Sequence, residues 1–594
     1  MKTMGAKHQT EDYYLGFRFV RSLVKLLPLL FPAWEWAVAL TALLFCVAAA
    51  NEYVTYHSGT IVGKFYNAFL AHDEKQFWNV FWRASLIYIG QTLLIAIVNL
   101  VSWILSLSFR KNLVSSLHKL YFEKNTYYDV NCVDNQGIDN PDQRITQDAE
   151  KMTSLLAKTI LPYLLVSPGV IAYYTWATWK QAGPVGVGCI YGYFLIGTIV
   201  NRIIVSPITK WSARVEKSEG DFRYKHVSVR DNAEESAFYD AHEFEKIESD
   251  SFLFVLLKNQ LRLAFWKFPA QYFQLFFDYY GGVLSYAIQA IPIFVMNSYQ
   301  GEDPATLGEQ ISNNAFYFIY LINSFTRLTD LAMNIGEMAG YTQRIARLVD
   351  YAQHAETHRG ETAIFEKTSI KDGVFSVKDL VFYAPNDDKR KILNGITFDI
   401  SSSKPMLISG VSGVGKTSIL RLLRQLWAPT RGQLERFVSY DEIVFLPQNT
   451  YLPIGNLSLK KQLHFPSTGD DSSFDETKIV NILEALSLSR LLALCGNLED
   501  KVDFEWNEIL SPGEQQRLSI ARVLLRKPKV VILDEATSGL SEDMEMTVYD
   551  LLKKNKICYV SVGHRSTLPE YHKVQLHIKG PDTWELKNID SNHF

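Results

Sequence analysis

Long apolar runs fill the first 340 residues of the chain, and short apolar runs separated by polar turns fill the rest. An α-helix needs about 20 predominantly apolar residues to cross a bilayer, and six of the long runs reach that length. The pattern predicts a membrane domain over residues 34–340, followed by a soluble part. The predicted spans are residues 34–56, 82–107, 157–178, 184–206, 268–297 and 314–335.

The charge of the intervening loops predicts the orientation in the membrane. Segments 108–156 and 207–267 are rich in Lys and Arg, whereas 298–313 has neither. Because Lys and Arg are retained on the cytoplasmic side, both long loops and both termini are expected in the cytosol. Residues 1–33 are predicted to form a cytosolic, amphipathic N-terminus that contacts membrane lipid and is not a cleaved signal peptide.

The fifth and sixth predicted spans are more polar than the others, and two interpretations of their polar residues stay open. Charged side chains inside a span are costly and usually face a cavity, which favours the lining of a transport path. They could instead form internal ion pairs, or the two stretches could be buried helices of a soluble domain. The candidate cavity residues are Asp278, Tyr279, Tyr280, Gln289, Asn323 and Arg327.

Beyond the spans the pattern changes. Residues 341–366 are polar and charged and are expected to be a linker, and residues 367–594 are expected to form a separate domain. There, short β-rich runs alternate with helical segments, which predicts an α/β domain with a largely parallel sheet. Strands are expected at residues 373–382, 396–400, 406–409, 443–446, 530–533 and 558–562.

The charge and cysteine content of the chain argue against nucleic-acid binding, a disulfide framework and a zinc site. A net charge of −3 gives no reason to expect a nucleic-acid partner. The five cysteines are scattered and form no Cys-x-x-Cys pair, so neither a disulfide framework nor a zinc site is expected.

Residues 410–417 read Gly-Val-Ser-Gly-Val-Gly-Lys-Thr, a phosphate-binding loop between an expected strand and an expected helix. Its glycines let several backbone N–H groups converge on an anion. Lys416 would place a charge on the β- and γ-phosphates, and Thr417 would offer a hydroxyl to Mg²⁺. We therefore expect ATP with Mg²⁺, bound by Gly410, Ser412, Gly413, Gly415, Lys416, Thr417 and Ser418.

Downstream motifs would supply the hydrolytic groups. Four apolar residues ending in Asp534 predict a buried strand that delivers a carboxylate to Mg²⁺. Glu535 is the expected general base for the attacking water. His564 would contact the γ-phosphate, and Gln448 would sense the metal and the γ-phosphate.

Two further nucleotide contacts are expected. In Leu-Ser-Pro-Gly-Glu-Gln-Gln-Arg, residues 510–517, Ser511, Gly513 and Glu514 open a helix whose N-terminus can cap a phosphate. Tyr383 is the candidate for stacking on adenine, although its spacing to Pro385 puts Ala384 at the usual position.

These ordered motifs resemble the ATP-binding cassette (ABC) family, and six spans followed by one cassette resemble a half-transporter. The resemblance implies a multi-domain membrane protein with a six-helix, all-α transmembrane domain like that of type IV exporters, followed by an α/β P-loop cassette. It implies an ATPase coupled to transport. It also implies a homodimer, because the Ser511–Gly513 signature acts on ATP held by the second copy.

Two cytosolic stretches resemble the coupling loops of subfamily D, the adrenoleukodystrophy-type half-transporters. They are residues 138–148, with Asn140, Asp142 and Gln143, and residues 232–239, with Glu234 and Glu235. The alternative for such charged stretches is a solvated surface.

Within that subfamily, residues 222–226, residues 506–514 and the early first span resemble the lysosomal, cobalamin-transporting branch. This implies insertion at the endoplasmic reticulum, a multispan escort protein to the lysosomal membrane, and movement of cobalamin from lumen to cytosol. Peroxisomal import of fatty acyl-CoA is the alternative, although the spans offer few cations for CoA phosphates. A low-turnover regulatory subunit is a second alternative, because Pro512 and Ser541 replace the family's usual glycine and aspartate.

Overall fold

The computed structural model describes residues 17–32, 36–133, 138, 140–295, 301–361, 365–366, 372–385, 387–468 and 476–589. Residues 1–16 of the predicted N-terminus lie outside this range. The chain divides into two compact units. The first comprises residues 1–119 and 140–350, and the second comprises residues 120–139 and 351–594.

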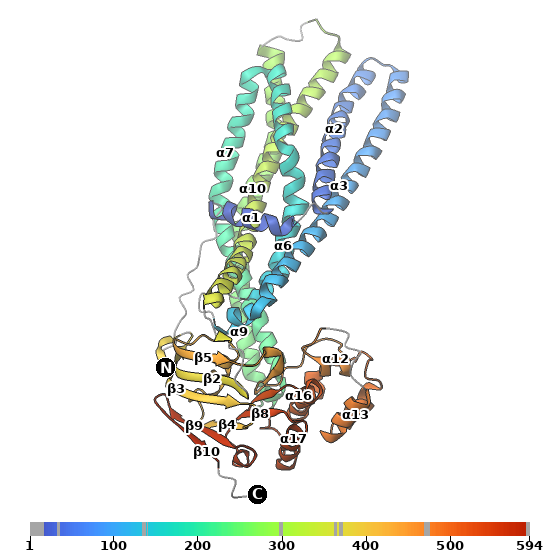
Figure 1. Ribbon diagram of the computed structural model, residues 1–594. Coiled ribbons are helices and arrows are strands. Elements are labelled where there is room, and N and C mark those ends of the chain that lie inside the picture. The colour runs from blue at the N-terminus through green and yellow to red at the C-terminus, as the bar shows by residue number, and fades with distance from the viewer. Residues whose placement is uncertain are drawn as a thin grey trace. The chain divides into compact units, whose positions relative to one another are not determined.

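Long helices dominate the first unit, as the pattern of apolar runs predicted (Figure 1). Their outward faces carry large apolar side chains such as Leu86 and Ile89, which are 72% and 66% exposed. Apolar surface of this kind is what a helix presents to lipid. The long helices are α2 (Trp36–Leu70), α3 (Glu74–Phe122), α7 (Leu161–Asp231), α9 (His242–Ala290) and α10 (Pro304–Glu361).

These helices carry the predicted spans, with two differences in how the spans are joined. The third begins on η4 (Leu155–Ile160) and continues on α7, which also carries the fourth and breaks at Gly183, where φ is 63° and ψ is −166°. Helix α10 runs on to Glu361, so most of the segment expected as a linker is helical. By length and mean hydropathy alone, three described helical segments qualify as membrane spans, namely Trp36–Leu70, Glu74–Phe122 and Pro141–Val200.

The amphipathic stretch before the first span forms helix α1 (Phe17–Leu30), which lies across the long helices (Figure 1). Its Leu26 and Leu30 are fully buried, whereas Val20 and Val24 are more than half exposed. The remaining short helical segments of this unit follow: α5 (Pro141–Gln143), η3 (Arg144–Asp148), α6 (Ala149–Ser154), η4 (Leu155–Ile160), α8 (Ala233–Phe238) and η5 (Ile291–Val295).

The second unit is built on two sheets, and every strand expected from the sequence is confirmed. The larger sheet is parallel except at β10. Its order is β10 (Thr583–Asn588), β9 (Val574–Gly580), β4 (Met406–Gly410), β8 (Cys558–Val562), β7 (Val530–Asp534) and β6 (Ile443–Leu446). The order of the smaller sheet is β1 (Phe365–Glu366), β5 (Arg431–Arg436), β2 (Gly373–Ala384) and β3 (Asp387–Ser401).

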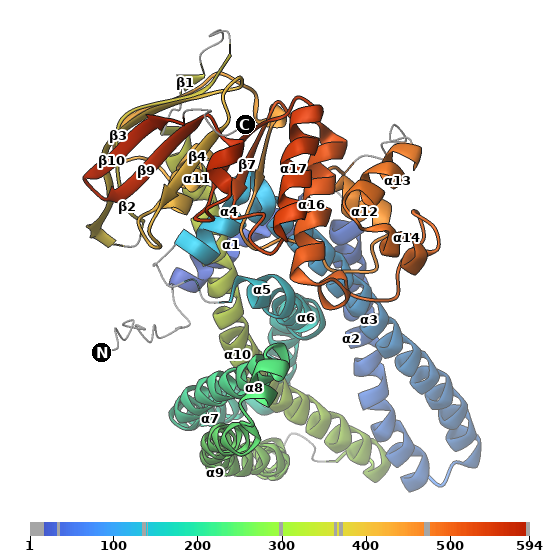
Figure 2. The ribbon, with the colours of Figure 1, turned by 90° about the horizontal axis from the view of Figure 1, so that it is seen from below.

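Helices gather on one side of the strands in this unit (Figure 2). Strand β7 lies between the two apolar cores: Val531 packs into the helical side, and Val530 and Ile532 pack toward the smaller sheet. A strand buried on both faces reads as a continuous apolar run, which is why it was predictable. The helices are α11 (Lys416–Leu423), α12 (Leu459–His464), α13 (Glu476–Ala485), α14 (Ser489–Cys495), α15 (Trp506–Ile509), α16 (Pro512–Arg526) and α17 (Glu542–Lys554).

A piece of the first long loop belongs to the second unit. It contains η1 (Glu123–Asn125), α4 (Thr126–Tyr128) and η2 (Asp129–Val133). The Trp427 indole donates to the Tyr128 hydroxyl at 3.1 Å. The short 3₁₀ segments η6 (Tyr440–Glu442) and η7 (Leu568–Tyr571) complete the unit.

Candidate nucleotide site

The phosphate-binding loop follows the buried strand β4, which lies between β8 and β9 in the parallel sheet. Gly410, Gly413 and Gly415 all have positive φ, at 149°, 83° and 102°. A Cβ on Gly410 would lie 2.3 Å from the carbonyl oxygen of Ile578, so only glycine fits at the strand end. The loop leads directly into α11, whose N-terminus carries a partial positive charge.

Lys416 begins α11 and turns its ammonium back over the loop. Its Nζ donates to the carbonyl oxygens of Gly410 and Val411, at 2.8 and 3.1 Å. This holds a positive charge where the backbone N–H groups converge. Ser412 is exposed on the loop, whereas Ser418 is buried on the helix.

Thr417 and Asp534 meet at the end of β7. The Thr417 hydroxyl donates to Asp534 Oδ1 at 3.2 Å. Burial raises the pKa of Asp534, as does the neighbouring Glu535, while the Thr417 hydrogen bond opposes them. The Thr417 hydroxyl and the Asp534 carboxylate offer oxygen atoms, and Glu535 adds a negative charge beside them. Oxygen ligands of this kind are those that Mg²⁺ prefers.

Glu535 lies between an amide and an imidazole. The Gln448 side chain donates to Glu535 Oε2 at 2.9 Å, and His564 Nδ1 lies 3.5 Å from Oε1. Glu535 adopts a left-handed backbone with φ of 49°, fixed by its N–H donating to the Val562 carbonyl. Non-glycine residues in this region are uncommon and concentrate at functional sites. The structure thus brings together the expected general base and the two residues expected near the γ-phosphate.

The signature motif forms the N-terminus of α16. The Ser511 hydroxyl accepts from Glu514 N at 3.3 Å, and Glu514 Oε2 accepts from Ser511 N at 3.0 Å. Burial alone would raise the pKa of Glu514, but its hydrogen bonds with Ser511, together with the charges of Arg490 and Arg517, lower it. Pro512 occupies the first helical position, where its missing N–H removes no intrahelical bond.

Tyr383 pairs with Lys391 across β2 and β3, and the Lys391 ammonium lies 6.0 Å from its ring centre. Ile392, the next residue on β3, lies beside the phosphate loop, because a Cβ on Gly415 would be 2.5 Å from its Cγ2. This places Tyr383 on a strand pair that borders the phosphate loop.

The six candidate cavity residues lie on α9 and α10 and differ in their exposure. Gln289 is buried and donates to the Ile311 carbonyl at 2.9 Å, whereas Tyr279 is 78% exposed. Arg327 lies over the Tyr320 ring at 5.7 Å. Asp278, Tyr280 and Asn323 are exposed. A cavity between α7, α9 and α10 is lined by residues close to these candidates, including Tyr193, Phe277, Phe325, Thr326 and Asp330.

The coupling-loop candidates lie on short helices. Asn140 precedes α5 with a left-handed backbone, and Asp142 and Gln143 lie within that helix. The next residue, Arg144, is 1% exposed and donates to the Arg344 carbonyl at 2.9 Å. Glu234 and Glu235 are exposed in the first turn of α8.

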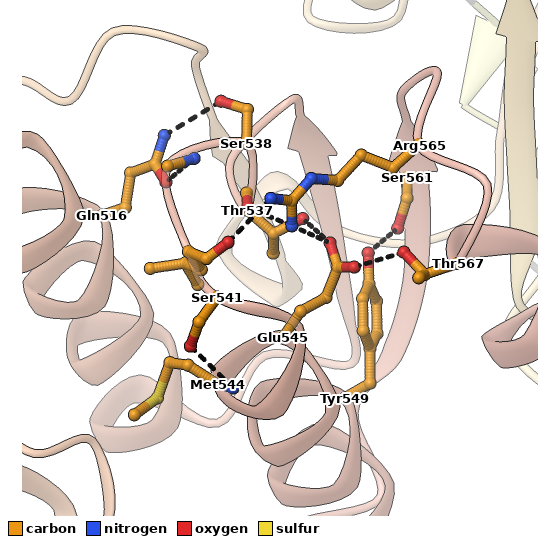
Figure 3. Close-up of polar contacts among 12 residues, drawn as sticks. Gln516, Thr537, Ser538, Ser541, Met544, Glu545, Tyr549, Ser561, Arg565 and Thr567 are labelled. Carbon is orange, nitrogen blue, oxygen red and sulfur yellow. Dashed lines mark hydrogen bonds and ion pairs between the residues drawn. The ribbon is translucent and has the colours of Figure 1, made fainter.

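Sequence reasoning missed a buried polar cluster beside the site, shown in Figure 3. Glu545 on α17 is fully buried and accepts hydrogen bonds from Thr537 and Thr567. Arg565 follows the predicted site residue His564 and pairs with Glu545. The only signal in the sequence was this adjacency.

Comparisons with known proteins agree with this architecture. Residues 26–294 match the family described as ABC transporter transmembrane region 2, and residues 393–538 match the ABC transporter family. A bacterial Atm1-family ABC exporter with ATP bound has a TM-score of 0.73 at 17% identity, covering 93% of this chain and 95% of the exporter. The fold and motifs define an ATPase coupled to membrane transport, with one transmembrane domain and one cassette.

Similar sequences identify the subfamily of ABC transporters to which the chain belongs. The chain is 35% identical to the lysosomal cobalamin transporter ABCD4 of Homo sapiens, and equally to that of Mus musculus, over 97% of both chains in each case. It is 26% identical to ABC transporter D family member 1 of Dictyostelium discoideum, over 98% of this chain and 91% of that one. The chain belongs to family D of the ABC transporters.

Proposed function

We propose that two copies of this chain form an ATP-driven transporter in the lysosomal membrane that moves cobalamin from the lumen to the cytosol. The observation that carries the proposal is the 35% identity, along 97% of both chains, to relatives named lysosomal cobalamin transporter. Insertion at the endoplasmic reticulum and delivery by a multispan escort protein belong to the same proposal.

ATP would bind on the phosphate loop. The loop N–H groups and the N-terminus of α11 would face the phosphates, and the Lys416 ammonium would bind phosphate oxygens. Thr417, Asp534 and Gln448 would hold Mg²⁺, and their hard oxygen atoms fit that ion. When bound, Mg²⁺ neutralises charge on the phosphate oxygens.

Glu535 would accept the proton of the attacking water. Gln448 and His564 contact opposite carboxylate oxygens of Glu535 and therefore fix its orientation. The His564 side chain is 69% exposed, so a γ-phosphate could reach its ring. Catalysis then depends mainly on positioning and on charge stabilisation.

Dimerisation follows from the number of motifs. Each chain has one phosphate loop and one signature helix, and Ser511 and Pro512 are exposed at the start of α16. An exposed helix N-terminus can cap the γ-phosphate of an ATP molecule held by a second copy. Two copies would complete two ATP sites.

The test is ATP hydrolysis by the full-length protein in lipid nanodiscs, with cobalamin and with a long-chain acyl-CoA in parallel. We expect saturable stimulation by cobalamin alone and its loss in Glu535→Gln. The matched control is Glu484→Gln, an exposed glutamate on α13, which keeps wild-type turnover.

Other outcomes would contradict the proposal in distinct ways. Stimulation by acyl-CoA alone would assign the chain to peroxisomal import. ATP binding without stimulated hydrolysis would favour the regulatory subunit. Uptake of labelled cobalamin into proteoliposomes, with ATP outside or inside, then tests the direction of transport.

A further inference from the structure

The loop that joins β7 to α17 is held by side chains from three other parts of the site. It begins at Glu535 and runs through Ser538 and Gly539 to Ser541. Its first residue is the proposed general base, so any displacement of the loop moves that carboxylate.

Arg565 fixes one side of the loop (Figure 3). Its guanidinium donates to the carbonyl oxygens of Thr537 and Leu540, at 3.2 and 2.7 Å. These two carbonyls bracket the turn at Ser538–Gly539. Arg565 directly follows His564 in the loop of residues 563–567, which we call the histidine loop. The Arg565 side chain therefore joins the histidine loop to the β7–α17 loop.

Glu545 holds Arg565 in that position. The carboxylate is fully buried, and its Oε1 lies 3.3 Å from Arg565 Nη1 and accepts from the Thr537 hydroxyl at 2.7 Å. Its Oε2 accepts from the Thr567 hydroxyl at 2.6 Å. Both oxygens therefore have partners, as a buried carboxylate requires. Removing one partner would leave a buried charge uncompensated.

The opposite side of the loop is held by the signature helix. Gln516 on α16 donates to the Ser538 hydroxyl at 3.3 Å, and its Oε1 accepts from Gly539 N at 2.9 Å. The same short loop thus contacts the helix that begins at Ser511 and the loop that carries His564.

We infer that Arg565, Glu545 and Thr567 are positioning residues that lock the β7–α17 loop to the histidine loop and so align Glu535 and His564 for hydrolysis. Gln516 extends the link to the signature helix. The inference rests on the proposed roles of Glu535 and His564, and it adds residues that lie outside the phosphate-binding loop and contact the β7–α17 loop or one another.

The test uses two conservative changes in the full-length protein. Arg565→Lys keeps the charge but loses the planar guanidinium that donates to two loop carbonyls at once. Thr567→Val keeps the shape and removes one hydrogen bond to Glu545. The matched controls are Arg526→Lys, an exposed arginine that donates to the Asp441 carbonyl, and Thr547→Val, whose hydroxyl bonds the Asp543 carbonyl on α17.

We expect kcat for ATP to fall about 10- to 100-fold in Arg565→Lys and less in Thr567→Val, because small misplacements of a catalytic group carry costs of that order. The KM for ATP and the binding of a fluorescent ATP analogue stay within about twofold, since neither residue belongs to the phosphate-binding loop and both bond to protein groups. The controls keep wild-type kcat. A structural role alone would lower thermal stability and leave kcat per folded molecule unchanged.

Three results separate the failures. Wild-type kcat in both folded Arg565→Lys and Thr567→Val, while Glu535→Gln is inactive, overturns the inference and leaves the proposed function standing. A parallel rise in KM also overturns it, because the residues would then act on binding. Undiminished hydrolysis in Glu535→Gln would instead overturn the proposed catalytic role itself. If Arg565→Lys does not fold, Thr567→Val decides.

Discussion

A buried histidine beneath the site makes the stability of the second unit depend on pH. His572 is 4% exposed, with Nδ1 2.7 Å from the Leu568 carbonyl and Nε2 2.8 Å from the Ser561 hydroxyl. Since a carbonyl only accepts, Nδ1 carries the proton and Nε2 accepts from Ser561. The neutral ring therefore satisfies both neighbours. Burial lowers the pKa of His572 to about 4, although the Leu568 hydrogen bond opposes this.

The direction in which stability changes with pH follows from comparing the protonation of His572 in the folded and unfolded chains. An unfolded histidine titrates near its ordinary pKa of 6.5, whereas folded His572 stays neutral down to about pH 4. Between these values the unfolded chain binds a proton that the folded chain does not. Stability is therefore complete above pH 6.5 and is lost as the pH falls toward 4. The loss is about 3 kcal/mol over the whole interval, and about 1.4 kcal/mol of it occurs by pH 5.5.

The assay is amide hydrogen exchange of peptides covering β8, in the full-length protein in nanodiscs. We expect the free energy of opening, corrected for intrinsic exchange rates, to fall by about 1.4 kcal/mol between pH 7.5 and 5.5 from His572 alone. In His572→Gln this contribution disappears, although the variant starts from a lower stability. His242→Gln, at a histidine whose side chain is 72% exposed, keeps the wild-type slope. An equal pH slope in His572→Gln and wild type would refute the reasoning.

Two further predictions concern the helical side of the cassette. Trp506 is 1% exposed and its indole donates to the Leu457 carbonyl at 2.9 Å, so Trp506→Ala should cost about 3–5 kcal/mol of unfolding free energy. Denaturant unfolding measures this, and Trp506→Phe should lose less because most of the volume stays. Ser511→Ala should destabilise the first turn of α16 by about 1 kcal/mol, measured by local hydrogen exchange, because the N-cap acceptor is lost. The control is Ser489→Ala on α14, which should leave exchange in the first turn of α16 unchanged. The same lack of change in Ser511→Ala would contradict the capping role.

The phosphate site was predictable because its information is local. The glycines of residues 410–415 sit in a fixed order between a strand and a helix, and the apolar run before Asp534 has the composition of a strand buried on both faces. Spacing alone therefore located Lys416, Thr417 and Asp534 at one end of a parallel sheet.

The buried cluster was not predictable because it depends on tertiary packing. Glu545 lies in the first turns of α17 with Glu542 and Asp543, where acidic residues are usually solvated partners of the helix dipole. Only the fold shows that Glu542 and Asp543 are exposed while Glu545 is fully buried.

The two departures from the family's motifs have a common structural explanation. Ser541 is the N-cap of α17 and its hydroxyl accepts from Met544 N at 3.4 Å. Aspartate and serine are comparable N-caps, so the exchange preserves the start of the helix. Pro512 likewise occupies a position where the helix needs no N–H donor, and the Ser511–Glu514 capping box stays intact. Both exchanges therefore change charge or donor number at the start of a helix while the helix keeps its geometry. This favours a transporter that turns over ATP over a subunit that has lost hydrolysis.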